Sequence, residues 1–177
     1  RSLLRVLNET NSILLADKDS QGNLQVNPVP LGLGELVEEV AADMRLIFEA
    51  ADVQLQCRTE PRLPPVLVDP AIFPSVLSNI LDNALKYSPP GSKVTVRTYA
   101  DGGSAVAVEV ADCGAAVPLD EQEKIFLKGY RGVNSQPGGG NGLGLYLARR
   151  IVEAHGGEVK LDQNGEKKFI VRLPVKR

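Results

Sequence analysis

The chain has 177 residues, of which 43% are hydrophobic, and its formal net charge at pH 7 is −2. This length and composition predict one globular domain with a real core, and the lack of a basic block disfavours a nucleic-acid partner. One histidine and two cysteines argue against a histidine-based metal site, a catalytic triad and a disulfide framework.

Apolar periodicity organises the first part of the chain into helices and short strands. The residues over 33–51 form the strongest amphipathic pattern, with glutamates on the polar side. In chain order we expect a helix over 1–16, a turn-rich linker over 17–22, a strand over 24–29, a helix over 33–51, and strands over 53–57 and 66–68.

The next helix has two candidate starting points. Asp69-Pro70 has the form of an N-cap followed by proline at the first helical position. Pro74 would disturb a helix begun there, because proline lacks a backbone donor. We therefore expect either a distorted first turn or a true start near Phe73, with the helix ending about Tyr87.

The remaining elements complete an α/β (α+β) two-layer sandwich. It combines a mixed, mostly antiparallel sheet with about three helices on one face. The expected elements are a hairpin of strands over 93–100 and 105–111, a short helix over 119–126, a candidate lid over 127–141, a helix that follows the glycine loop and ends before Gly156, and a closing hairpin of strands over 159–161 and 169–173.

A glycine-rich loop opens the last helix, with five glycines between Gly138 and Gly144. Glycines let the backbone approach a ligand closely, and the helix N-terminus offers free N–H groups and a favourable dipole to an anion. The pattern indicates a phosphate site. A mobile loop before a packing helix is the alternative.

Polar residues share one side of the helix that ends near Tyr87. At about 100° per residue, Ser75, Asn79, Asn83 and Lys86 fall in one narrow stripe. The stripe points away from the apolar side, so Asn79 and Asn83 lie side by side. Amide oxygens are hard ligands, and with phosphate oxygens they suit Mg²⁺. A solvated polar face is the alternative.

A carboxylate follows the second strand of the 93–111 hairpin. Asp112 stands directly after the strand, and Gly114 permits a sharp turn. A carboxylate in this place can accept a hydrogen bond from the amino group of a base. A turn-forming aspartate is the alternative.

Taken in order, these motifs resemble the ATP-binding catalytic domain of sensor histidine kinases. That domain belongs to the Bergerat-fold, or GHKL, superfamily, which also contains gyrase, heat-shock chaperone and mismatch-repair ATPases. NILDNALKYSP resembles the family's asparagine box, ADCGAAVP its first glycine box, IFLKGYRG its phenylalanine box and GGGNGLGL its second glycine box. The resemblance covers essentially the whole chain.

The resemblance implies a cofactor pair, ATP and Mg²⁺, and a role for each matching residue. Asn83 and Asn79 are the implied metal ligands, Asp112 the adenine acceptor, and Asn79, Lys86 and Arg131 the catalytic group. The implied nucleotide-binding residues are Asn79, Asn83, Lys86, Tyr87, Asp112, Gly114, Ala116, Tyr130, Arg131, Gly140, Gly142, Leu143 and Gly144.

Two positions depart from the family's pattern. Ala116 replaces the second glycine of the first glycine box, and Gly129 stands where an aromatic residue precedes Tyr-Arg. An alanine disfavours a positive φ, so weakened nucleotide binding is one expectation. Chaperone-type relatives activate water with a glutamate, and Asn79 in the matching region is no base. This favours transfer to a nucleophilic histidine over hydrolysis.

The resemblance also implies partners outside the chain. The acceptor histidine is expected upstream of Arg1, on a dimerisation domain, and a response regulator then receives the phosphate. Residues 1–22 are expected to be the end of a dimerisation helix with its linker, and residues 23–177 the catalytic domain. The missing initiator methionine indicates a fragment, which we expect to be cytoplasmic and monomeric, from a homodimeric protein with or without a membrane anchor.

Two other functions remain open at this point. One is a Bergerat-fold serine kinase of the anti-sigma type, which needs no acceptor histidine. The other is a degenerate nucleotide-binding module used for docking, which the departures at Ala116 and Gly129 favour. His155 is the only histidine, and its expected role is that of a helix C-terminal residue, which the helix dipole favours there and which Gly156 caps.

Overall fold

A computed structural model describes residues 2–133, 135 and 140–175, with side chains from residue 10 onward. Its elements in chain order are α1 (Ser2–Ser20), β1 (Val29–Leu31), α2 (Leu33–Ala50), β2 (Gln54–Thr59), β3 (Val66–Val68), α3 (Pro74–Tyr87), β4 (Lys93–Asp101), β5 (Ala105–Asp112), η1 (Leu119–Glu121), η2 (Lys124–Phe126), α4 (Gly144–Ala154), β6 (Glu158–Asp162) and β7 (Lys167–Pro174). Within this part of the chain, no helix is both long and apolar enough to cross a membrane.

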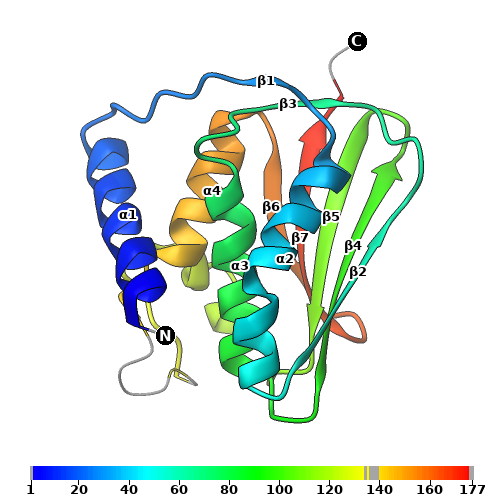
Figure 1. Ribbon diagram of the computed structural model, residues 1–177. Coiled ribbons are helices and arrows are strands. Elements are labelled where there is room, and N and C mark those ends of the chain that lie inside the picture. The colour runs from blue at the N-terminus through cyan, green and yellow to red at the C-terminus, as the bar shows by residue number, and fades with distance from the viewer. Residues whose placement is uncertain (1, 134, 136–139, 176–177) are drawn as a thin grey trace.

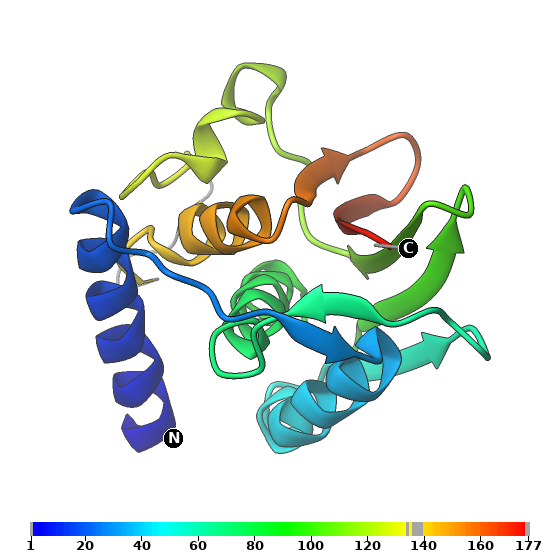
Figure 2. The same cartoon turned by 90° about the horizontal axis from the view of Figure 1, so that it is seen from above.

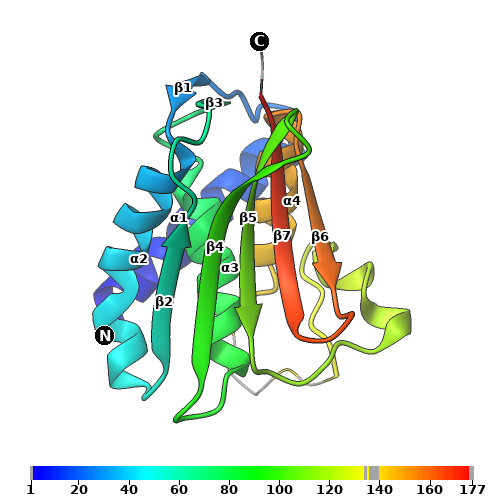
Figure 3. The same cartoon turned by 90° about the vertical axis from the view of Figure 1, so that its right-hand side faces the viewer.

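Five strands form the main sheet, in the order β2-β4-β5-β7-β6. Strands β2 and β4 run parallel, and the other neighbouring pairs are antiparallel. Helices α2, α3 and α4 cover one face of this sheet (Figures 1 and 3). The predicted two-layer sandwich with a mixed, mostly antiparallel sheet is therefore confirmed.

The core lies between the sheet and these three helices. Its largest fully buried side chains come from every layer, and they include Phe48 of α2, Ile80 of α3, Ile151 of α4 and Phe169 of β7. Period-two alternation explains the strand contribution, since every second residue of β7 is buried. The apolar stripes of α3 and α4 explain the helix contribution. The polar residues of both helices are thereby left outside the core.

Helix α1 stands outside the sandwich and packs on α4 (Figure 2). It continues to Ser20, so the linker predicted over 17–22 is wrong for its first four residues. The extra turn is held by the Ser20 hydroxyl, which donates to the carbonyl of Ala16 at 2.8 Å. Ala16 itself is buried, and Asp19 forms an ion pair with Arg150 of α4 at 3.1 Å.

Other boundaries also differ from expectation, for local reasons. The strand predicted over 24–29 lies instead at β1, which pairs antiparallel with β3 in a separate two-stranded sheet. Helix α3 starts at Pro74 after Phe73, so the start near Phe73 is correct. Asp69 does not cap α3, because its carboxylate accepts from the N–H groups of Asn27 and Ala71.

The helix predicted over 119–126 is replaced by two 3₁₀ turns, η1 and η2. Phe126 is buried in the core, whereas Leu119 is 88% exposed. A continuous α-helix therefore has no second apolar anchor to hold its first turn against the core.

Candidate functional site

Three segments meet at the end of the sheet where β5 terminates: α3, the loop after β5, and the loop that opens α4. Tyr87 of α3 contacts Gly114, because a Cβ atom added at this glycine would lie 2.8 Å from the Tyr87 Cβ. In the same way, an added Cβ would lie 2.8 Å from Lys86 Nζ at Gly140, and 3.6 Å from Asn79 Oδ1 at Gly144. The polar side of α3 thus touches both predicted glycine boxes.

Asp112 is 1% exposed and holds the centre of this region. Its Oδ1 accepts from the N–H of Gly114 at 2.8 Å and lies 3.0 Å from Lys167 Nζ. Its Oδ2 is buried and has no hydrogen-bond partner in the described part of the chain. A buried acceptor without a partner is costly in a folded protein, and it calls for a functional explanation.

Gly114 is required for space. A Cβ at this position would lie 2.7 Å from Asp112 Oδ1 and 2.8 Å from the Tyr87 carbonyl oxygen. Ala116, in contrast, is exposed, and its φ is not positive, because Asp52 and Arg62 are the only non-glycine residues with positive φ among those described. The alanine that departs from the family's pattern therefore causes no backbone strain.

Asn79 and Asn83 lie outside the apolar core and are half-buried. Asn79 faces the first turn of α4, and its Nδ2 is buried without a partner within the described residues. Lys86 lies 3.5 Å from Asp82 Oδ2 on its own helix and extends toward Gly140. These side chains gather on the predicted side of α3, but Asn79 is less open to solvent than its stripe suggested.

The backbone of the glycine loop at Gly142 packs directly against the backbone of the preceding segment at Gly129 and Tyr130. Gly142 has a φ of +71°, and an added Cβ would lie 2.7 Å from the Tyr130 carbonyl oxygen. The Gly129 N–H donates to the Gly142 carbonyl at 3.0 Å, and Gly129 has a φ of +73°. An aromatic residue at 129 would be strained there, which explains this departure from the pattern.

Helix α4 begins without a side-chain cap in the described structure, after Leu143 at the N-cap position. The N–H of Leu143 is bound by Asn141 Oδ1 at 3.1 Å, and the next N–H groups form the open end of the helix. Such an end suits an anion. Gly138 and Gly139, at the start of the predicted glycine run, lie outside the described residues.

The segment that resembles the phenylalanine box is anchored at one end. Phe126 packs edge-on against Phe169 at 6.2 Å between ring centroids, and Arg149 lies 4.8 Å above the Phe126 ring. Tyr130 is half-buried and Arg131 is exposed. The Tyr87 hydroxyl lies 3.3 Å from the Ser135 hydroxyl, so Ser135 of the candidate lid contacts α3.

His155 has a structural role, as predicted. Its Nε2 accepts from the Asp69 N–H at 2.9 Å, so its Nδ1 carries the proton and donates to the Ile151 carbonyl at 2.7 Å. The ring also packs edge-on against Phe73 at 5.3 Å. Both ring nitrogens are therefore used by the fold.

Lys167 was missed by the sequence analysis. It is 7% exposed, lies directly opposite Asp112 in the β5–β7 register, and reaches the Ala115 carbonyl at 3.1 Å. A signal for it existed: counting back by two from Phe169 places Lys167 on the core-facing side of β7.

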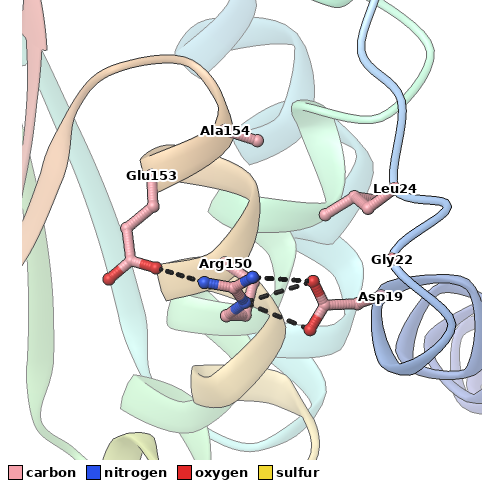
Figure 4. A pocket seen from close by; sticks show the side chains of 6 residues that line it. All are labelled: Asp19, Gly22, Leu24, Arg150, Glu153 and Ala154. Carbon is pink, nitrogen blue, oxygen red and sulfur yellow. Dashed lines mark hydrogen bonds and ion pairs between the residues drawn. The ribbon is translucent and has the colours of Figure 1, made fainter.

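A hollow of about 280 Å³ lies between α1 and α4 (Figure 4). Figure 4 shows the Asp19 carboxylate paired with the Arg150 guanidinium in its lining, with Glu153 bound to the same arginine. Burial raises the pKa of Asp19, but the hydrogen bonds from Arg150 and Tyr146 outweigh it and hold the pKa below 3.8. This hollow contains none of the predicted site residues.

The sheet with helices on one face, the buried aspartate after β5 and the glycine loop into α4 define the class of an ATP-binding α/β sandwich. A family model described as "Histidine kinase-, DNA gyrase B-, and HSP90-like ATPase" matches residues 68–177. This match takes in more than half of the chain, and the chain belongs to that family.

Its relatives include sensor kinases. The adaptive-response sensory kinase SasA of Rippkaea orientalis is 34% identical over 180 residues, which take in 100% of this chain and 46% of the relative. The chain therefore spans about half the length of the relatives it matches.

Solved structures agree with this assignment. The mycobacterial sensor histidine kinase MprB has a TM-score of 0.70 and 27% identity, over 85% of this chain and 97% of that chain. Histidine kinase ThkA in its complex with the response regulator TrrA has a TM-score of 0.75 and 20% identity, over 94% of this chain and 48% of that chain, and supports the fold. The predicted class, a histidine-kinase ATP-binding catalytic domain with the Bergerat fold, is confirmed.

Proposed function

We propose that the chain binds Mg-ATP between α3 and its two glycine loops and donates the γ-phosphate to a histidine on a dimerisation domain. The observation that carries this proposal is the contact of α3 with both loops beside a buried carboxylate oxygen that has no partner. ATP use itself follows from the family.

The adenine end of the nucleotide belongs at Asp112. Its Oδ2 is a hydrogen-bond acceptor in a buried setting, and the exocyclic amino group of adenine is a donor of the right kind. Because this atom has less than 1 Å² exposed, a local shift of the surrounding residues accompanies nucleotide entry. Gly114 packs directly against the carboxylate and against Tyr87, and Ala116 lies on the same loop as Gly114.

The phosphate end belongs at the start of α4. Lys86 beside Gly140 supplies a positive charge, and the open N-terminus of α4 after Gly142, Leu143 and Gly144 supplies N–H groups and a favourable dipole. Tyr130 and the exposed Arg131 lie on the segment bound to Gly142, from which Arg131 would neutralise charge on the transferred phosphoryl group.

The residues present fit Mg²⁺ only in part as protein ligands. No group of three or more histidine, cysteine, aspartate or glutamate side chains gathers within the described residues. The amide oxygens of Asn83 and Asn79 would hold the ion together with phosphate oxygens, which is the arrangement that Mg²⁺ favours. When bound, the ion would neutralise negative charge on the phosphates.

Transfer to histidine fits the residue type of Asn79, which faces the start of α4 and is an amide that cannot act as a general base. An imidazole is itself a nucleophile, so positioning and electrostatics are sufficient contributions from this domain. His155 is engaged by the fold, so the acceptor belongs to another segment, for which residues 1–22 are the proposed connection and residues 23–177 the catalytic domain. The proposal also includes a homodimeric full-length protein, in which this kinase segment is cytoplasmic, and a response regulator that receives the phosphate.

The test uses the full-length protein with Mg²⁺ and ATP labelled at the γ-phosphate. We expect acid-labile label on a histidine outside this chain, and its loss in Asn83→Ala. Acid-stable label on serine would support the serine-kinase alternative, which the relatives do not favour. Absence of both label and ATP binding would support a docking module.

A further inference from the structure

Lys167 combines burial with charge in a way that the proposed function does not yet use. Its side chain projects from the core-facing side of β7, where the next inward residues are Phe169 and Val171. A lysine in such a row is costly unless its ammonium is paired and hydrogen-bonded. It is paired here with Asp112, across the β5–β7 register.

The two members of this pair differ in how fully their hydrogen-bonding groups are used. The ammonium lies 3.0 Å from Asp112 Oδ1, donates to the Ala115 carbonyl at 3.1 Å, and lies 5.5 Å from the centroid of the Tyr87 ring. The cation thus has two oxygen partners and an aromatic ring within cation–π distance. The carboxylate has two partners on Oδ1 and none on Oδ2 within the described chain.

We infer that Lys167 positions Asp112 for the base, and that it thereby sets a preference for 6-aminopurine nucleotides. It binds Oδ1 together with the Gly114 N–H, so the carboxylate cannot rotate and Oδ2 is the acceptor left for the ligand. The paired carboxylate offers no donor, so it favours an amino group at C6 of the purine. The inference rests on the proposed function, because it takes Asp112 as the base-binding residue.

The test compares two nucleotides that differ by the amino group alone: ATP and purine riboside 5′-triphosphate. Calorimetric titrations give the ratio of their Kd values in each variant. A hydrogen bond to a charged group is worth about 10- to 100-fold in affinity, so we expect a ratio of that size for the wild type. In Lys167→Met the carboxylate loses its anchor, and we expect the ratio to fall at least about threefold, with Lys167→Arg restoring most of it.

Lys168→Met is the matched control. Lys168 is the neighbouring residue on the same strand, and it pairs with Glu109 at 3.6 Å, away from Asp112. It should leave the ratio unchanged. Because each ratio is measured within one variant, a general loss of stability does not mimic the effect. If Lys167→Met does not fold, Lys167→Gln, which has a shorter side chain without the charge and so a weaker hold on Oδ1, is measured in its place and should also lower the ratio.

The outcomes distinguish a failure of the proposed function from a failure of the proposed role of Lys167. If the wild type binds neither nucleotide, the proposed function fails. If the wild type prefers ATP and Lys167→Met, or Lys167→Gln in its place, retains the full preference, the proposed function stands and the role of Lys167 is overturned. A purely structural lysine would lower both affinities equally and leave the ratio in place.

Discussion

Two aspartates each meet a cation in this molecule, and their surroundings differ in one respect. Asp19, at the end of α1, has both oxygens engaged: Arg150 Nε lies 3.1 Å from each, and the Tyr146 hydroxyl also donates to Oδ2. Asp112, at the end of β5, has one oxygen engaged by Lys167 and the Gly114 N–H, while the other has no partner among the described residues.

This difference distinguishes a structural ion pair between two helices from a carboxylate that can bind a ligand. A carboxylate whose lone pairs are filled has nothing to gain from a ligand, and it contributes by holding α1 on α4. A buried carboxylate with an empty lone pair keeps a desolvation cost that a ligand donor relieves. Ion pairing by itself therefore does not mark a site, and the count of unfilled acceptors does.

The largest expected effect comes from neutralising each aspartate in turn. Asp112→Asn replaces a charged acceptor by an amide that can present either atom, and we expect ATP affinity to fall at least about 10-fold. Asp19→Asn should change ATP affinity by less than about twofold. Calorimetric titration of ATP with Mg²⁺ measures both, and equal losses would erase the distinction between the two carboxylates.

A smaller effect is expected from adding one methyl group beside Asp112. In Gly114→Ala the new Cβ would lie 2.7 Å from Asp112 Oδ1, so the carboxylate or Tyr87 must move. Overpacking of this kind costs about 1–3 kcal/mol, and we expect roughly a 10-fold loss of ATP affinity. The reverse change on the same loop, Ala116→Gly, should stay within about twofold because Ala116 is exposed and unstrained. A large gain of affinity in Ala116→Gly would show that the alanine does limit binding.

Much of the fold follows from patterns that are local in the sequence. The amphipathic stripe of α2, the alternation of β4, and the proline at the start of α3 each fix an element with little help from the rest of the chain. The elements that sequence reasoning misplaced are held by distant contacts. The β1 strand depends on its pairing with β3, and the last turn of α1 depends on Arg150.

The site divides in the same way. Asn79, Asn83, Asp112 and the glycines stand in compact motifs, so their residue types and spacing predict a shared site. Lys167 lies 55 positions after Asp112 in the chain and is brought to it only by the β5–β7 register. The role of Gly129 also depends on a contact that is distant in the sequence, because its backbone N–H donates to the carbonyl of Gly142.

The next prediction tests the ion pair between Asp19 of α1 and Arg150 of α4. Arg150→Met removes the guanidinium from Asp19, and partly exposed ion pairs are worth about 1 kcal/mol or less. We expect hydrogen exchange in residues 10–20 to quicken by about two- to fivefold, with ATP affinity unchanged. Arg149→Met is the matched control: this neighbour lies over Phe126 and pairs with Glu123 at 3.0 Å, so its loss should loosen η2 and leave α1 protected. If both variants loosen α1 equally, the contact between Asp19 and Arg150 is not what holds this helix.

The smallest expected effect is the pH dependence of the same contact between Asp19 and Arg150. The hydrogen bonds from Arg150 and Tyr146 outweigh burial and place the pKa of Asp19 below its ordinary value of 3.8. A depressed folded-state pKa stabilises the contact above the unfolded value, and this contribution is lost as the pH falls through the folded value. We therefore expect the backbone amide signals of Tyr146 and Arg150 to be constant between about pH 7 and 5, and to shift below about pH 4 as α1 loosens.

Asp69 also has a lowered pKa, chiefly from the Asn27 N–H, and it titrates in the same acidic range. Asp19→Asn separates the two, because in that variant the shifts at Tyr146 and Arg150 should disappear while the signals around His155, which is bound to the Asp69 backbone, continue to respond.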